Sequence, residues 1–323
     1  MGILTVNSDP WKLWGNDYQP EHDYSKDYLT FESLEDGEFA YTICYGDDSE
    51  GGGIVYASAK LQYSFNGEDW FDWARPHEIS ESINVLANQK LYVRGYTQPL
   101  NSAITDGVFG TVKFSSTCRF NACGLLSSLL YGYDYTNKEF IWTKQPMKTT
   151  HFSELFINCD KLISAENLIL PQELVNSCYY QTFYGCTSLT TAPELPATTL
   201  ADYCYQLMFN GCTSLTTAPE LPAITLVNGC YYYMFKGCTA LTTAPELPAT
   251  TLTQYCYYGM FQDCSNLNYI KAMFTTTPSS TYTSNWVNGV STEGTFVKNS
   301  AATWNVTGNN GVPTRWTVQT ASA

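Results

Sequence analysis

The chain of 323 residues is long enough for about two or three compact units, and its hydrophobic content of 44% excludes a disordered protein. Its formal net charge of −14, from 16 basic and 30 acidic residues, excludes a nucleic-acid backbone or an anionic membrane surface as an electrostatic partner. No stretch approaches a membrane-spanning length, and the first residues lack the basic region of a signal peptide. We therefore expect a protein made in a cytoplasm, not exported by the usual route and not inserted into a membrane.

Residues 1–26 are predicted to form an extended arm. The segment carries Trp11, Trp14 and Tyr18 among polar and turn residues, and it shows no apolar period. Two interpretations remain open: a tail without fixed structure, and an aromatic peptide that docks onto another subunit.

Residues 27–121 are predicted to form an all-β sandwich. Apolar residues recur at spacing two in short runs, as in Leu29 and Phe31, and turn signals such as Asn66-Gly67 separate the runs. Residues 122–150 follow as a helical cap or linker. In it, Gly124–Tyr131 is expected to be a short helix that covers the core of the next unit.

Residues 151–270 carry a repeat of 26 residues, which predicts a solenoid of stacked coils. The repeat is marked by two series of cysteines, and a degenerate copy around Cys159 precedes it with one extra residue. The first series is Cys178, Cys204, Cys230 and Cys256, and the second is Cys186, Cys212, Cys238 and Cys264.

Each repeat is expected to hold a short helical segment and an extended segment. In the second copy, Tyr205–Cys212 is predicted to be a helical turn and a half ended by Gly211. The following prolines limit strand pairing, so the parallel sheet should be narrow and centred on residues 216–218. Residues 271–323, where the period fails, are predicted to form a β cap. The fold class is thus mainly β with short helices.

The repeated cysteines are predicted to be small buried hydrophobic residues. Equivalent side chains of neighbouring coils lie about 4.8 Å apart, which exceeds the ~3.8 Å between Cβ atoms in a relaxed disulfide. No Cys-x-x-Cys pair is present, so no metal site is expected.

The sequence offers no catalytic constellation, and we expect neither an enzyme nor a cofactor. The three histidines have no triad or metal-binding companion at useful spacing. Glu194, Glu220 and Glu246 form a like-charge series that must face solvent or a cation. A glycosidase-like pair among them would need unequal pKa values, whereas their environments are nearly equivalent.

The positions that vary between repeats are the candidate binding face for a partner or receptor. The invariant residues belong to the core that stacking requires, which leaves the variable ones on the exposed side. A tyrosine-rich variable face suits sugar rings or a protein groove, and neutral drift on a solvated face is the alternative. The candidates are Tyr180, Tyr184, Tyr203, Gln206, Tyr232, Tyr233, Lys236, Tyr255 and Tyr258.

The repeat pattern Phe-x-Gly-Cys-Thr-Ser-Leu, followed by a proline-bounded strand, resembles the BspA-like leucine-rich repeats of Bacteroidetes proteins and their bacteriophages. The resemblance covers residues 150–270. The segments Leu29–Phe39, Tyr63–Trp70 and Thr283–Val290 are similar to modules that accompany these repeats in phage or prophage proteins.

This resemblance implies a non-enzymatic phage virion protein, a fibre or decoration protein, with a host-attachment role. Its arm, with Trp11, Trp14 and Tyr18, would bind other virion proteins. The solenoid would bind a host cell-surface protein or polysaccharide, and the protein would be a homo-oligomer. The alternative is a BspA-like adhesin on the bacterial cell surface. The lack of an export signal favours the phage particle, and an enzyme acting on polysaccharide comes third.

Overall fold

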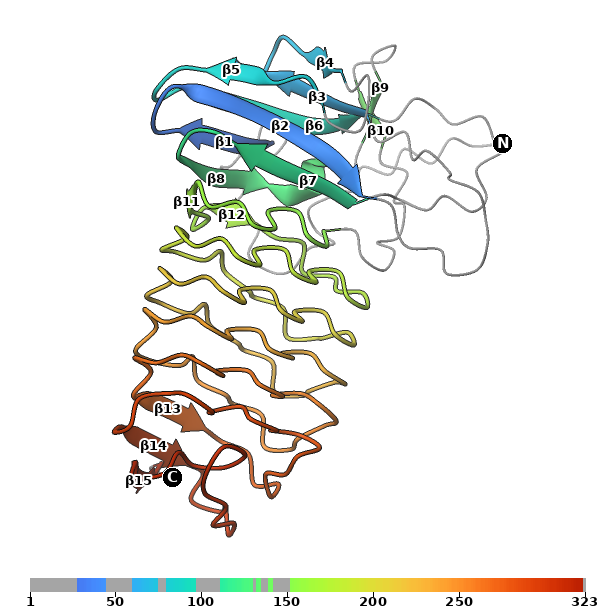
Figure 1. Cartoon of the computed structure of the whole chain (residues 1–323). Coiled ribbons are helices and arrows are strands. Elements are labelled where there is room, and N and C mark those ends of the chain that lie inside the picture. Colours follow the sequence, from blue (N-terminus) through green and yellow to red (C-terminus); the bar gives the residue numbers. More distant parts are fainter. Residues whose placement is uncertain are drawn as a thin grey trace, which may run out of the picture.

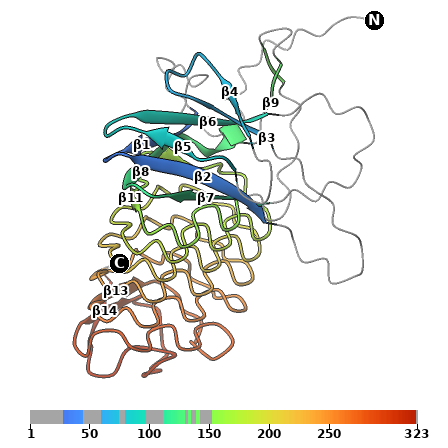
Figure 2. The same ribbon diagram turned by 45° about the horizontal axis from the view of Figure 1, so that its top comes forward.

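The computed structural model describes residues 28–44, 60–74, 80–96, 111–129, 132–134, 139–141 and 152–321. Over these residues the chain is mainly β, and its single helical element is a 3₁₀ turn, η3 (Leu126–Leu129). Layers of strands lie at one end of a stack of coils (Figure 1), and the turned view keeps this order (Figure 2). The arm residues Trp11, Trp14 and Tyr18 fall outside the described residues.

The strand region contains two sheets and a hairpin. The larger sheet has the order β11-β8-β1-β6-β3-β4, with β12 also paired to β8. The smaller one has the order β5-β2-β7, and β9 pairs with β10. The strands are β1 (Leu29–Ser33), β2 (Gly37–Cys44), β3 (Lys60–Ser64), β4 (Phe71–Trp73), β5 (Ile83–Val85), β6 (Lys90–Tyr96), β7 (Thr111–Ser116), β8 (Phe120–Leu125), β9 (Gly132–Asp134), β10 (Glu139–Ile141), β11 (Leu162–Ser164) and β12 (Leu168–Ile169).

Aromatic side chains join the two sheets into one core. Phe31 of β1 lies 5.0 Å, between ring centroids, from both Phe39 of β2 and Phe114 of β7. The alternation predicted this inward face, and Leu29, Phe31, Phe39 and Phe114 are buried. Phe65, expected on the same face, lies just beyond β3 and is 38% exposed.

Strand β8, and not a helix, joins the strand region to the first coil. It pairs in parallel with β11 and β12, and the N–H of Phe114 in β7 donates to Leu155 O at 2.8 Å. Phe156 of the coil meets the rings of Phe31 and Phe114 at 6.1 and 6.0 Å between centroids. The first coil therefore continues the core of the sheets.

The predicted helix at Gly124–Tyr131 is wrong. Gly124 and Leu125 belong to β8, and only Leu126–Leu129 forms a 3₁₀ turn. Through Ser128, this turn accepts a hydrogen bond from Leu29 N and donates one to Val93 O, so it packs on β1 and β6. One edge of β8 carries backbone donors and acceptors that pair with the first coil. The coil therefore covers the core at this end, and none is left for a helix to cover.

The predicted helical turns of the repeat are also wrong. Each of these segments is a chain of overlapping turns, in which every fourth residue has a left-handed backbone, as at Tyr203 (φ 55°), Leu207 (φ 57°) and Gly211 (φ 76°). Alternate N–H groups donate within the coil, as from Gln206 to Tyr203 O at 3.1 Å. The others donate to the next coil, as from Leu207 to Tyr232 O at 2.8 Å. In a helix, all of these N–H groups would point along the helix axis and bond within the helix, so none would be left to join the coils.

The extended segments pair only narrowly. Single parallel bridges join Thr191 to Thr217 and Thr243 to Tyr269, close to the predicted centre of the sheet. Regular strands appear at the C-terminal end, where β13 (Tyr269–Ala272), β14 (Thr295–Lys298) and β15 (Thr317–Thr320) form a parallel sheet. Tyr269 pairs with Thr295, so the spacing of 26 residues persists in space where the sequence pattern has faded.

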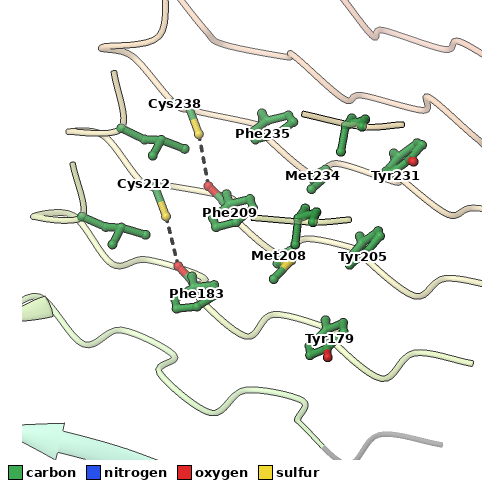
Figure 3. Packing of buried hydrophobic residues seen from close by; sticks show 14 of the residues in the cluster. Tyr179, Phe183, Tyr205, Met208, Phe209, Cys212, Tyr231, Met234, Phe235 and Cys238 are labelled. Carbon is green, nitrogen blue, oxygen red and sulfur yellow. Dashed lines mark hydrogen bonds between the residues drawn. The ribbon is translucent and has the colours of Figure 1, made fainter. Parts of the chain in front are cut away.

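Two aromatic columns fill the coils (Figure 3). Tyr179, Tyr205, Tyr231 and Tyr257 stack at 5.8 to 6.0 Å between centroids. Phe183, Phe209, Phe235 and Phe261 stack at 5.4 to 5.8 Å. The rings are nearly parallel and fully or almost fully buried, so each coil buries its aromatic face against its neighbours.

The predicted burial of the cysteines is confirmed for both series, and the eleven cysteines whose side chains the structure describes are free thiols. The second series has a role that the sequence did not show. The thiol of Cys212 donates to Phe183 O at 3.1 Å, and that of Cys238 donates to Phe209 O at 3.1 Å, in each case in the preceding coil (Figure 3).

Replacing one ring of the phenylalanine column should destabilise the whole stack. Phe209→Ala opens a cavity between Phe183 and Phe235, and we expect a loss of about 3–5 kcal/mol in the free energy of unfolding. Urea denaturation followed by circular dichroism measures it. Ile224→Ala, at a position that is 70% exposed, is the control and should change stability by less than about 0.5 kcal/mol. Equal effects of the two substitutions would contradict the packing described here.

The buried thiols should make the fold sensitive to alkali. Burial raises the pKa of Cys178 and Cys264 to about 12 and that of Cys256 to about 11, whereas an unfolded thiol ionises near pH 8.5. Because the folded pKa values are raised, this contribution to stability is complete below about pH 8.5 and is lost as the pH rises toward 11 or 12. We expect the urea midpoint to be flat between pH 6 and 8 and to fall steeply above pH 9. A midpoint that stays constant to pH 10.5 would contradict this expectation.

Candidate functional site

Along each turn segment, side chains alternate in pairs: two point into the core and the next two lie on the outside of the coil. In the second coil, Cys178 and Tyr179 point into the core, Tyr180 and Gln181 are half-buried on the outside, and the next pair turns inward again. All nine candidate residues of the variable face occupy such outward positions and are half-buried. They lie on the outer face of the turn segments.

Four of the candidates form one compact group, here called the tyrosine cluster: Tyr232, Tyr233, Tyr255 and Tyr258. The rings of Tyr232 and Tyr258 stack at 4.9 Å between centroids, and Tyr233 meets Tyr232 edge-on at 4.7 Å. Tyr255 meets Tyr258 edge-on at 5.9 Å. The cluster spans two neighbouring coils and holds its rings in fixed mutual orientations.

Three further side chains border the cluster. The Lys236 ammonium lies 5.1 Å from the centre of the Tyr233 ring, in the geometry of a cation–π contact. The Tyr203 hydroxyl accepts a hydrogen bond from Asn228 Nδ2 at 3.1 Å. The cluster therefore presents aromatic edges, hydroxyls and one cation together.

The remaining candidates lie apart from this group. Tyr180 and Tyr184 belong to the second coil, where Tyr180 is next to Glu154. Gln206 follows Tyr180 in the column that leads to Tyr232 and Tyr258, and it interrupts the run of aromatic rings. The structure thus brings together Tyr203, Tyr232, Tyr233, Lys236, Tyr255 and Tyr258, and it leaves Tyr180, Tyr184 and Gln206 toward the strand end.

Three tyrosines of this face have left-handed backbones, with φ values of 55° at Tyr203, 52° at Tyr233 and 57° at Tyr255. This conformation costs a residue with a side chain about 1–2 kcal/mol, and it is rare for bulky residues. The equivalent positions of other coils carry glycine at Gly229 and Gly259, which adopts it without cost.

Those two glycines seat the rings of the preceding coil, a relation that our sequence analysis missed. A Cβ atom on Gly229 would lie 2.3 Å from the Tyr203 ring, and one on Gly259 would lie 2.0 Å from the Tyr233 ring. The signal was present, because each glycine follows a tyrosine by one repeat at a variable position. The large residue and the glycine therefore form a pair across coils.

Three tyrosine hydroxyls of this face have raised pKa values. Burial, followed by the nearby Tyr258 and Tyr232 hydroxyls, raises the pKa of Tyr233 to about 12. Burial also raises the pKa of Tyr232 and of Tyr180. At neutral pH the face therefore offers neutral hydroxyl groups that can both donate and accept hydrogen bonds.

Two buried acceptors beside the cluster lack a hydrogen-bond partner within the described part of the chain. They are Asn228 Oδ1 and Gln262 Oε1. Asn228 holds the Tyr203 hydroxyl with its amide nitrogen, and Gln262 occupies the position that Lys236 holds one coil earlier. An unpaired buried oxygen costs about 1–3 kcal/mol, so these two oxygens also lower the stability of the fold at this face.

The glutamate series lies on solvent-exposed positions, as its mutual repulsion requires. Glu194, Glu220 and Glu246 are exposed, and Glu246 pairs with Lys271 of β13 at 2.9 Å. In the described residues, no group of His, Cys, Asp and Glu side chains is placed to hold a metal ion. Within the same residues, no helix is long and apolar enough to cross a membrane. All three histidines fall outside the described ranges.

Comparison with known proteins identifies no relative: no family model, no curated protein and no solved structure matches the chain.

The pairing of Tyr203 with Gly229 should appear as a coupling free energy. Gly229→Ala introduces a left-handed alanine and a clash with the Tyr203 ring, so we expect a loss of about 2–4 kcal/mol in stability. In the Tyr203→Ser background the clash is gone, and the same change should cost only about 1 kcal/mol. Gly211→Ala is the matched control, because Gly211 is also left-handed but a Cβ there has only ordinary contacts, at 3.6 Å or more. Urea denaturation of the four variants tests the pairing, and additive effects would contradict it.

Proposed function

We propose that the protein is a non-enzymatic binding protein whose recognition surface is the tyrosine cluster together with the neighbouring Tyr203. The observation that carries this proposal is the left-handed backbone at Tyr203, Tyr233 and Tyr255. At these positions glycine would adopt the backbone conformation without strain, and the chain uses glycine at the equivalent positions of neighbouring coils. Every coil has left-handed residues, but bulky side chains rarely adopt this conformation, and three tyrosines that do so on one face are typical of a site retained for binding.

The chemistry of the cluster supports a ligand with both apolar faces and hydroxyl groups. Tyrosine offers a large, stiff contact area with few rotatable bonds, so little entropy is lost when it binds. The neutral hydroxyls and Lys236 supply hydrogen bonds at the margin. A host cell-surface polysaccharide or glycoprotein presents this combination of groups.

We further propose that the stacked coils are a leucine-rich-repeat solenoid of the BspA-like kind and that the two packed sheets form a β-sandwich. The coil spacing, the buried leucines and cysteines, and the aromatic core between the sheets support this assignment. With the sequence resemblance, it favours a phage virion protein, a fibre or decoration protein. In that role the arm with Trp11 and Trp14 attaches the protein to the particle, and the coils face the host.

Binding to intact Bacteroidetes cells tests the recognition surface. The labelled protein should bind saturably, and a variant with Tyr203, Tyr232, Tyr233 and Tyr255 all replaced by serine should lose at least about 90% of that binding. The variant should still fold, because Ser177 already occupies a position equivalent to Tyr203 and Tyr255. Circular dichroism and thermal unfolding check its fold.

A second variant controls for a general change of the coil surface. Glu194→Gln with Glu220→Gln alters the exposed glutamate series and should leave binding unchanged. Equal binding by the tyrosine variant and the wild-type protein would contradict the proposed surface. Release of reducing ends from the cell polysaccharide would contradict a non-enzymatic role.

A further inference from the structure

The C-terminal end of the coil stack closes with an open strand edge. Strand β15 is the last strand of the parallel sheet β13-β14-β15, and within the described residues it pairs with β14 alone. All four of its residues, Thr317–Thr320, are exposed, and Val318 is 48% exposed. Figure 1 shows β15 at the end of the stack opposite the larger sheets.

The free edge carries unused backbone donors and acceptors. The N–H groups of Thr317 and Ala321 donate to Gly294 O and Lys298 O, on the side of β14. Because these directions alternate along a strand, the N–H and C=O groups of Val318 and Thr320 point away from β14. An edge of this kind is a template for a further strand.

The usual protections of a strand edge are missing here. Natural edges carry lysine, proline or a bulge that prevents pairing with another chain. Strand β15 has the sequence Thr-Val-Gln-Thr, without charge, proline or glycine. Two of its residues are threonine and one is valine, all β-branched and well suited to a strand.

The charge distribution favours a second copy of the same chain as the occupant. The chain has a net charge of −14, so most contacts between two copies would bring like charges together. Residues 299–323 contain a single charged side chain, Arg315. The C-terminal end is therefore a surface on which two copies can meet without acidic repulsion.

We propose that two copies of the chain associate end to end by antiparallel pairing of β15 with β15, around a twofold axis at Gln319. In this register Val318 of one copy exchanges backbone hydrogen bonds with Thr320 of the other, in both directions, and Gln319 faces itself. The contact is self-complementary, as a twofold interface requires. It places the strand regions of the two copies at opposite ends of the pair.

Sedimentation equilibrium of the full chain tests the association. A short strand pair buries less than the standard interface, so dissociation in the micromolar range is expected. The average mass should rise with concentration from the monomer mass of 36.2 kDa toward twice that value. A wild-type protein that stays monomeric at about 100 µM would overturn the proposal.

Two substitutions locate the contact. Val318→Pro removes an N–H that points away from β14, and Val318→Lys places a charge on the edge; each should weaken the dimer at least tenfold. Ile224→Lys is the matched control, because it puts the same charge at another exposed β-branched residue and should leave the dimer intact. Thermal unfolding verifies that all variants fold. Dimers that persist in both Val318 variants would show that another surface joins the copies.

A cysteine at position 319 tests the register. In the proposed pair the two Gln319 Cα atoms lie about 4.5 Å apart, within the range that a disulfide spans. Gln319→Cys should form a covalent dimer under mild oxidation, and the same change combined with Val318→Lys should not. An equal yield of cross-linked dimer with and without Val318→Lys would overturn the twofold pairing.

Discussion

The alternation of backbone hydrogen bonds along the turn segments is the interaction on which the rest of the molecule depends. Every second N–H reaches the carbonyl of the next coil, as from Phe209 to Met234 O at 2.9 Å. This ladder fixes the rise and the register between coils together. The aromatic columns can stack only because the ladder brings each ring above its equivalent. The thiols add a further set of bonds, from Cys212 and its equivalents to the coil before.

The ladder has a conformational cost that the core offsets. A donor can point to the next coil only if the chain is turned, and the left-handed residues at every fourth position produce that turn. Each non-glycine residue there costs about 1–2 kcal/mol, while each buried ring contributes about 1.5–3 kcal/mol. The two effects meet in the same segment, with rings on the inner side and strained residues on the outer side. The recognition surface that we propose uses this outer side, where the backbone is already held rigidly.

The sequence predicted the features that follow from repetition and burial. The coil spacing, the inward cysteines and the invariant rings such as Phe209 were predictable, because stacking allows little variation at those positions. The inward faces of β1 and β2 followed from alternation. The turn conformation was not predictable in the same way, because a bond from residue i to residue i−3 suits a helical turn and a chain of turns equally. The function of β8 depends on where its free edge lies in space, and a local pattern carries no such information.

The proline-rich arcs give the stack two unequal sides. Between the second and third coils, no backbone hydrogen bond joins the arc from Pro193 to Leu200 with the arc from Pro219 to Leu226. Proline is suited to such an arc, because its missing N–H has no partner to lose. These two coils are thus bonded along the turn side and held by side-chain packing along the proline side, whereas backbone hydrogen bonds such as that from Thr275 N to Thr250 O join the arcs at the C-terminal end of the stack. A force that separates the proline sides of these coils should meet less resistance than one that separates their turn sides. This part of the stack should therefore bend easily in one plane and resist bending in the other.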